Sequence, residues 1–339
     1  MTQSELKVLW LRPSTGDNVS VRRQRIAEHL EEMGIETELV DVSGRDLPGA
    51  IRTALTGDHD IIVGNVRMGL YLGYPLARLL GKPFVGDVSD PIEQIKGLPA
   101  PIYRLIERYE WYILKRADAT VFVYESSYQT AKEHGIKGRK LPNAVNYSIF
   151  ANPDPSAIKT AKDELTNAGV DLHRKIGIYT GTLTDRYSLT ELSEAATKAD
   201  GWDFVFIGDG DMKTEFEAFA GDIDNIYYLG TYEHHLIPGF LYHADVGFCL
   251  IDAEQPLKLK EYGAAGLPII AQPGGLSQLY DKDELMFVEP SSEAIADALD
   301  RLTDDALRAR YAAAGQKIAS ERSWKTIAEG YQDIFYQIV

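Results

Sequence analysis

Short apolar runs alternate with longer amphipathic stretches along most of this chain. Residues 7–11 and 61–64 are apolar runs of strand length, and a stretch with helical periodicity follows each of them. Residues 35–42 and 83–88 have the same strand character, and helices are expected at 21–33 and 70–80. This succession of strand, loop, helix and strand predicts a parallel sheet with helices on its faces.

The same pattern starts again in the second half of the chain. Residues 152–175 are rich in Pro, Asp and Lys and have weak periodicity, which indicates a linker with a polar helix. Strands are then expected at 176–179, 202–207, 226–230, 245–251, 269–271 and 287–288. A chain of 339 residues can hold two domains. We therefore expect an α/β protein with domains at residues 1–165 and 170–322.

The stretch 251–272 has a clear local organisation. Pro256 suits the first turn of a helix, and Gly266 and Pro268 end that helix before a short buried strand. At helical spacing, four residues share one face: Leu257, Glu261, Ala264 and Ala265. Lys258 is expected at the edge of that face and Lys260 away from it. A carboxylate on a packing face needs a partner. Glu261 therefore pairs either with a nearby Arg or Lys or with ligand hydroxyl groups such as those of a ribose.

Composition and charge exclude several classes of protein. Hydrophobic residues make up 45% and charged residues 25% of the chain, which is typical of a globular protein. The net charge of −16 argues against a general nucleic-acid-binding protein, which needs a basic surface. The single cysteine, Cys249, excludes an intrachain disulfide and lies in an apolar run, so we expect it in the core. We expect a cytoplasmic protein, because no run of 18 apolar residues and no signal-peptide pattern is visible.

Polar residues follow two of the predicted strands in the first half. Gly16 and Asp17 come after the first strand, where sheets of this kind bind ligands, although an ordinary turn explains them equally well. Asp87 lies at the end of the strand at 83–88, and Asp90 comes just after it. Two carboxylates at this position are either part of a site or caps of the next helix.

Residues 101–116 form a long amphipathic helix with many aromatic and basic side chains. Such a helix either lies on a membrane surface or packs on the sheet. Glu107 and Glu110 reduce its basic character, which favours packing. The adjacent His234 and His235 lack the spacing of a zinc site, and we expect no metal site.

The stretch 251–270 resembles the donor-binding segment of family-4 glycosyltransferases. The similarity is to the branch with the pattern PLK, EY, G and P, here Pro256-Leu257-Lys258, Glu261-Tyr262, Gly266 and Pro268. The common form of the family has two glutamates; Glu261 occupies the second position, whereas the first falls on Ala253, next to Glu254. Three other places match in the same order: Arg116-Ala117-Asp118, Pro142-Asn143 and the Gly181 loop.

This resemblance implies the GT-B fold, with two Rossmann-like, doubly wound parallel-sheet domains that face a cleft. It also implies that the C-terminal helix, 323–339, packs back on the first domain. Residues 1–165 would then be the acceptor side, with Gly16 and Asp17, and residues 170–322 would bind the nucleotide-sugar donor.

The resemblance assigns roles to individual residues. Glu261 would bind the ribose of the donor. Gly208, Asp209 and Tyr232 would line the nucleobase, and Asp252, Glu254, Gln255, Pro256 and Leu257 would face the donor sugar or its phosphates.

A leaving diphosphate needs a cation or a helix N-terminus. The family's basic pair follows the loop glycine, Gly181, but its two positions fall here on Thr182 and Tyr187, with Arg186 one place earlier. Lys258, in the first turn of the next helix, offers the missing charge. We therefore regard Arg186 and Lys258 as catalytic candidates, together with Asp87 and Asp90.

The function implied is a retaining transfer of a sugar from a UDP- or GDP-linked donor, without a metal or cofactor. The acceptor would be a glycan or a lipid-linked molecule, with possible peripheral contact at the inner membrane face. A sugar-nucleotide epimerase of the same fold and a non-catalytic nucleotide-sugar-binding protein are the alternatives.

Overall fold

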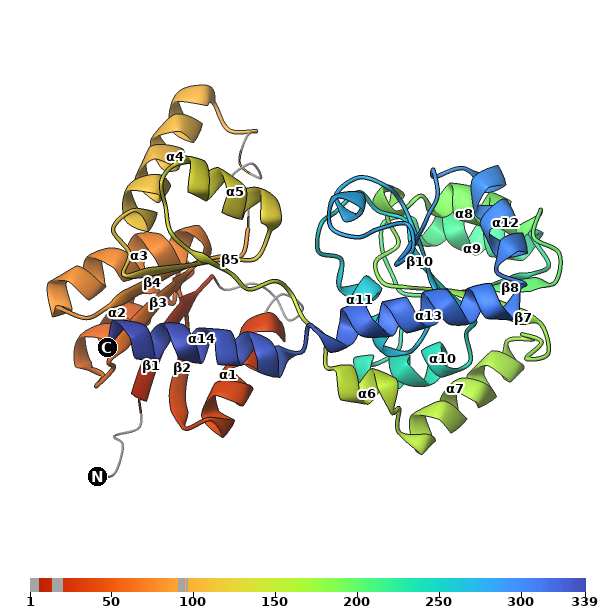
Figure 1. Cartoon of the computed structure of the whole chain (residues 1–339), viewed down its shortest axis with the longest axis horizontal. Coiled ribbons are helices and arrows are strands. Elements are labelled where there is room, and N and C mark those ends of the chain that lie inside the picture. Colours follow the sequence, from red (N-terminus) through yellow and green to blue (C-terminus); the bar gives the residue numbers. More distant parts are fainter. Residues whose placement is uncertain (1–5, 14–20, 91–94, 96) are drawn as a thin grey trace. The chain divides into compact units, whose positions relative to one another are not determined.

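The computed structural model describes residues 6–13, 21–90, 95 and 97–339. The chain divides into two compact units (Figure 1). The first comprises Met1–Asn143 with Trp324–Val339, and the second comprises Ala144–Ser323.

The first unit is a parallel sheet of six described strands with helices on its faces. The strand order is β2-β1-β3-β4-β5-β6. The strands are β1 (Leu6–Arg12), β2 (Ile35–Asp41), β3 (Ile61–Asn65), β4 (Phe84–Val88), β5 (Ala119–Phe122) and β6 (Arg139–Lys140). The helices are α1 (Val21–Glu32), α2 (Leu47–Thr56), α3 (Val66–Leu80), α4 (Ala100–Leu114), α5 (Glu125–Glu133) and α14 (Trp324–Ile338).

The C-terminal helix α14 packs against α1. The ring of Tyr331 in α14 lies 5.0 Å from that of Trp10 in β1, and both side chains are fully buried. Arg22 of α1 donates hydrogen bonds to the carbonyl oxygens of Leu141 and Pro142 and to the hydroxyl of Tyr331. The end of the chain is therefore part of the core of the first unit.

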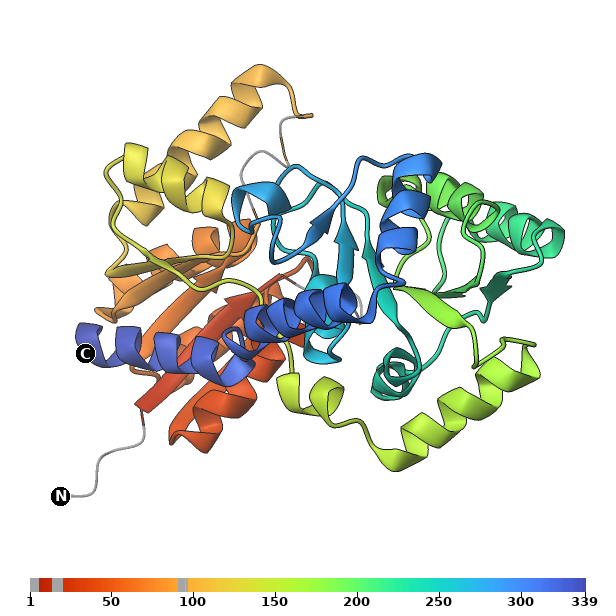
Figure 2. The same cartoon turned by 45° about the vertical axis from the view of Figure 1, so that its right-hand side comes forward.

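The second unit repeats this architecture. Its strand order is β12-β11-β10-β7-β8-β9, again parallel throughout. The strands are β7 (Lys175–Thr180), β8 (Trp202–Ile207), β9 (Ile226–Tyr228), β10 (Val246–Cys249), β11 (Ile269–Ala271) and β12 (Met286–Phe287). The α-helices are α6 (Tyr147–Ala151), α7 (Pro155–Asn167), α8 (Leu189–Ala196), α9 (Lys213–Asp222), α10 (Ile237–Tyr242), α11 (Leu257–Ala264), α12 (Ser292–Arg301) and α13 (Asp305–Ser320). Both units show helices on the two sides of their sheets in Figures 1 and 2. The predicted α/β class with two doubly wound sheets is confirmed.

One domain boundary differs from the pattern-based expectation. The stretch 152–175 contains the expected polar helix, α7, which packs on α10 and groups with the second unit, as does α6. The expected end of the first domain at residue 165 therefore lies later than the observed division. Within the described part of the chain, no helix has the length and apolar character needed to cross a membrane.

Candidate functional site

The carboxyl ends of β10, β7 and β8 converge on two glycine loops. In this sheet β8 and β9 follow on one side of β7, and β10, β11 and β12 follow on the other. The order in which the chain adds parallel strands therefore reverses between β7 and β10. Doubly wound sheets bind ligands at such a switch point. The loop after β7 begins with Gly181, the loop after β8 begins with Gly208, and α11 follows β10.

The two loops approach each other so closely that only glycine fits. Gly181 has φ +134° and Gly208 has φ +153°. A Cβ atom at Gly208 would lie 1.8 Å from the carbonyl oxygen of Gly181. A side chain at this position would force the loops apart, which explains the predicted importance of both glycines in terms of backbone geometry.

Lys258 lies beneath the Gly181 loop, in the first turn of α11. Its Nζ atom is 3.7 Å from the ring centroids of both Tyr179 and Tyr187. A Cβ atom built on Gly181 would lie 3.1 Å from this Nζ, so the ammonium group is directed at the loop. The two rings hold a cation by their negative faces.

The ammonium group of Lys258 is buried without a hydrogen bond. The residue is 7% exposed, and among the described residues no group accepts a hydrogen bond from Nζ. Burial lowers the pKa of Lys258 to about 7, although Cys249 and Glu261 oppose this shift. A buried cation that lacks an acceptor is costly unless a ligand supplies one.

A cavity of about 210 Å³ lies at the Gly181 loop, at which Lys258 is directed. It is lined by Thr180, Gly181, Ile207, Gly208, Thr231, Tyr232, His234, Ile237 and Glu261. Glu261 lies one turn after Lys258 on α11, and its Oε1 is 2.9 Å from Nε2 of His234. The side chain that meets Glu261 is thus a histidine rather than the Arg or Lys considered from sequence. Tyr232 donates a hydrogen bond to Glu164 from α7, which fixes its ring at the cavity wall.

The predicted faces of α11 were wrong. Leu257, expected on the packing face, is 45% exposed, whereas Lys258 and Lys260 are buried. Lys260 donates a hydrogen bond from Nζ to Oε1 of Gln255, which is also buried. Helix α11 has only eight residues, and buried lysines contribute to its packing. The spacing of apolar residues therefore did not predict which face of α11 packs against the rest of the unit.

The other donor-side candidates surround the cavity less directly. Arg186 and Thr182 are exposed and are not among the residues that line the cavity. Asp209 accepts a hydrogen bond from the backbone of Gly210, and Asp252 accepts one from the backbone of Gly275. Pro256 precedes α11 at its N-cap, and Glu254 is half-buried. Asp209 and Asp252 therefore shape loops.

In the first unit, Asp87 is completely buried at the end of β4. Its Oδ2 accepts a hydrogen bond from the side-chain amide of Asn65, 2.8 Å away. Burial raises the pKa of Asp87, and the positive charges of Arg22 and Arg23 oppose this shift. Asp90 is half-buried and interacts electrostatically with Arg23. Gly16 and Asp17 lie outside the described residues.

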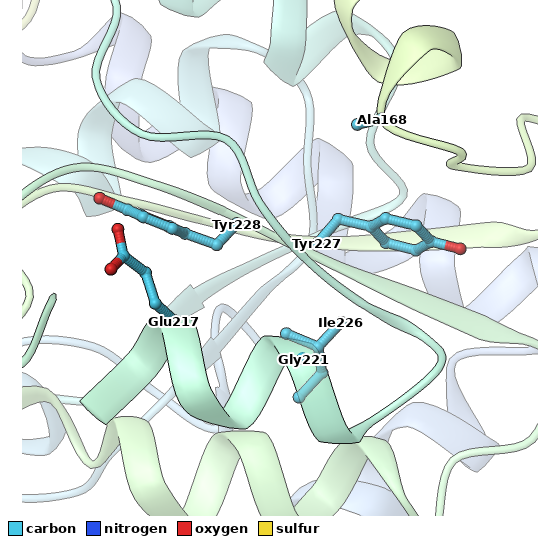
Figure 3. Close-up of a pocket in the computed structure, with 6 residues that line it drawn as sticks. All are labelled: Ala168, Glu217, Gly221, Ile226, Tyr227 and Tyr228. Atoms are coloured by element: carbon cyan, nitrogen blue, oxygen red, sulfur yellow. The ribbon is translucent and has the colours of Figure 1, made fainter. Parts of the chain in front are cut away.

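A larger cavity of about 320 Å³ lies at the edge strand β9 of the second unit (Figure 3). It is lined by Ala168, Glu217, Gly221, Ile226, Tyr227 and Tyr228. Figure 3 shows Tyr227 and Tyr228 pointing to opposite sides of β9, with Glu217 of α9 on the side of Tyr228. Since this lining contains a carboxylate and no cationic side chain, it does not suit an anionic ligand. Among the described residues, no group of three or more His, Cys, Asp or Glu is arranged to hold a metal ion.

Comparison with known proteins identifies the second unit. Residues 174–305 match the family described as Glycosyl transferases group 1. The second unit therefore carries a glycosyl transferases group 1 region. The matched region contains both glycine loops, Lys258 and Glu261. Comparison with curated proteins gives no match.

Solved structures share the fold over nearly the whole chain. The Anabaena protein Alr3699/HepE in complex with UDP-glucose has a TM-score of 0.73 at 18% identity, covering 98% of this chain and 100% of the other. A glycosyltransferase from Rickettsia africae has a TM-score of 0.77 at 16% identity, covering 98% of both chains. Sucrose-phosphate synthase from Thermosynechococcus elongatus has a TM-score of 0.74 at 15% identity, covering 98% of this chain and 99% of the other. These likenesses show that the chain has the GT-B fold.

Sequence reasoning missed three residues of this site. Tyr179 and Tyr187 hold Lys258, and His234 meets Glu261. Tyr187 was visible in the sequence only as the residue at a position that is basic in the family. Its contact with a lysine 71 positions away is a tertiary feature that no local pattern contains.

Proposed function

We propose that this chain transfers a sugar from a nucleoside-diphosphate sugar to a hydroxyl acceptor, and that Lys258 binds the diphosphate. The observation that carries this proposal is the buried ammonium group of Lys258, directed at the Gly181 loop, which lines a cavity of about 210 Å³. A diphosphate oxygen would accept the hydrogen bond for which Lys258 Nζ has no partner among the described residues. The free N–H groups at the start of α11, next to Lys258 in the chain, also favour an anion.

The donor is proposed to be UDP-linked. HepE binds UDP-glucose in a structure with the same fold. Glu261 and its neighbour His234 are placed at the cavity wall, where the carboxylate suits the two hydroxyl groups of a ribose. Tyr232, Gly208 and Asp209 would then lie near the base, and Asp252, Glu254 and Gln255 near the sugar.

The proposed reaction breaks the bond between the anomeric carbon and the β-phosphate oxygen and forms a bond from that carbon to the acceptor oxygen. Configuration is retained, and the acceptor proton passes to the leaving phosphate. The charge that develops on the diphosphate is stabilised by Lys258, with Arg186 as a second, exposed cation, and without a metal ion. The acceptor is a glycan or a lipid-linked molecule.

On the acceptor side we propose that Asp90 rather than Asp87 contacts the acceptor. Asp90 is half-buried, whereas Asp87 has no exposed surface and interacts with Asn65, Arg22 and Arg23. Gly16 and Asp17 remain candidates for the same side from their place after β1.

Binding of UDP, GDP, ADP and CMP by isothermal titration calorimetry, with and without Mg²⁺, tests the donor site. We expect UDP to bind without metal, and Glu261→Ala to weaken it by about tenfold or more, since hydrogen bonds to a charged group contribute about 1.5–3 kcal/mol. Glu194→Ala, an exposed glutamate on α8, is the matched control and should leave binding unchanged. If none of the nucleotides binds, or if both variants behave alike, the proposed site is wrong.

A further inference from the structure

The outer face of α4 in the first unit differs in charge from the rest of the chain. The protein has a net charge of −16. On α4, however, the exposed charged side chains are Arg104 and Arg108, and the exposed Lys115 and Arg116 follow its last turn. In Figures 1 and 2, α4 lies along the margin of the first unit. A basic surface has thus formed on a strongly acidic protein.

Neither acidic residue of α4 is fully exposed. Glu110 is 4% exposed; its Oε2 lies 3.6 Å from Nε of Arg67 and accepts a hydrogen bond from the hydroxyl of Tyr71. Glu107 is half-buried and accepts a hydrogen bond from Tyr103. The sequence alone suggested that these carboxylates reduce the basic character of the helix, but the fold buries Glu110 and leaves Glu107 only partly exposed.

An apolar stripe runs beside the basic residues. It consists of Ile102, Leu105, Tyr109 and Tyr112, which are spaced three, four and three residues apart and are all exposed. Leu105 is 71% exposed. The tyrosines are held in place by α3, since Tyr109 lies 5.3 Å from Tyr71 and Tyr112 lies 6.2 Å from Tyr74 between ring centroids. A contiguous exposed apolar stripe of this kind marks an interaction surface.

We propose that the α4 face, formed by Ile102, Arg104, Leu105, Arg108, Tyr109 and Tyr112, docks on an anionic phospholipid surface. An apolar stripe beside a basic row is the arrangement of a helix that lies in the plane of a membrane interface. Anionic headgroups attract each nearby Arg or Lys. A second copy of the chain is a poor occupant, because a two-fold contact through this face would bring arginines of both copies together. This surface is separate from the donor site, and vesicle binding requires no catalysis.

Flotation of the full chain with phospholipid vesicles tests the proposal. The vesicles contain either phosphatidylcholine alone or phosphatidylcholine with phosphatidylglycerol. We expect binding to the anionic vesicles at low salt and weak binding to the neutral ones. Arg104→Glu with Arg108→Glu should lower the affinity at least about tenfold, given about 1 kcal/mol for each basic residue near the surface. Lys159→Glu with Lys162→Glu, an equal charge change on exposed positions of α7, is the matched control and should behave as the unmodified protein.

A third variant separates apolar insertion from charge attraction. Leu105→Gln removes the most exposed apolar residue of the stripe without changing charge, and should weaken the binding that persists in 0.5 M NaCl. Circular dichroism confirms that each variant is folded. Absence of vesicle binding overturns the proposal. An equal loss of vesicle affinity in the α4 double variant and the α7 double variant also overturns it. Binding to an acidic polypeptide such as polyglutamate but to no vesicle would assign the face to a protein partner and would also overturn it.

Discussion

Each unit buries charge at the carboxyl end of its sheet, but the two buried sites differ in how that charge is balanced. In the first unit the positive charges of Arg22 and Arg23 act on Asp87, and Asn65 donates a hydrogen bond to its Oδ2, while its Oδ1 has no hydrogen-bond partner among the described residues. In the second unit Lys258 lies between two tyrosine rings, and no described group accepts a hydrogen bond from its ammonium. Similar burial therefore serves two purposes. Opposite charges that lie close together stabilise the fold, whereas a buried cation without a described hydrogen-bond acceptor is available to bind an anion.

The largest effect expected from this comparison is on stability in the first unit. Asp87→Asn keeps the shape of the side chain but removes the carboxyl group on which the charges of Arg22 and Arg23 act. Breaking a buried charge cluster in this way costs about 3–5 kcal/mol. Urea unfolding followed by circular dichroism should show this loss. A cost below about 1 kcal/mol would mean that the cluster is not balanced by Asp87.

Lys258→Met should give the opposite pattern. The free energy of unfolding should stay equal or rise, because a buried cation without an acceptor is removed and the methionine fills its space. Turnover should fall by about 10²–10³, the cost of losing one group that stabilises a developing anion. Slow hydrolysis of the UDP-sugar, with water as acceptor, measures turnover without knowledge of the natural acceptor.

Arg186→Met is the control for that experiment. Since Arg186 is exposed to solvent, whereas Lys258 is buried and directed at the Gly181 loop, we expect Arg186→Met to affect turnover much less than Lys258→Met. Equal losses in the two variants, or near-normal turnover in Lys258→Met, would contradict the assignment of Lys258 as the main diphosphate ligand.

A smaller effect on UDP affinity should come from the ring of Tyr187, one of the two that contact Lys258. Tyr187→Phe keeps the aromatic face, whereas Tyr187→Leu removes it. A desolvated cation–π contact contributes about 2 kcal/mol. We therefore expect UDP to bind Tyr187→Leu up to about thirtyfold more weakly and to bind Tyr187→Phe normally. If both variants lose affinity alike, the hydroxyl and not the ring is responsible, and the cation–π account of Lys258 is wrong.

Much of the fold was predictable because its signals are local. Apolar runs at 7–11, 61–64 and 202–207 correspond to β1, β3 and β8, and parallel pairing then brings the loops after β7 and β8 to one edge. Gly181, Gly208 and Glu261 could be selected from sequence for this reason, and all three line the cavity.

The rest was not predictable because it depends on contacts between distant segments. The spacing of α11 suggested that Leu257 is buried and Lys258 peripheral, whereas the reverse holds. The two tyrosines that make a buried lysine tolerable come from β7 and the turn after it. The burial of Glu110 likewise depends on Arg67 and Tyr71 of α3. A helical pattern gives the spacing of residues but not which side faces the core.

Proton uptake on UDP binding tests the central claim most directly. With a pKa of about 7, Lys258 is mostly neutral at pH 8 in the free protein. A bound diphosphate favours the ammonium form, so binding at pH 8 should take up nearly one proton, and affinity should rise as the pH falls from 9 to 7. The terminal phosphate of UDP is already ionised at pH 8 and contributes little. Calorimetry in two buffers of different ionisation enthalpy measures the uptake. The account predicts an uptake approaching one proton that disappears in Lys258→Met; no uptake, or the same uptake in both proteins, would contradict it.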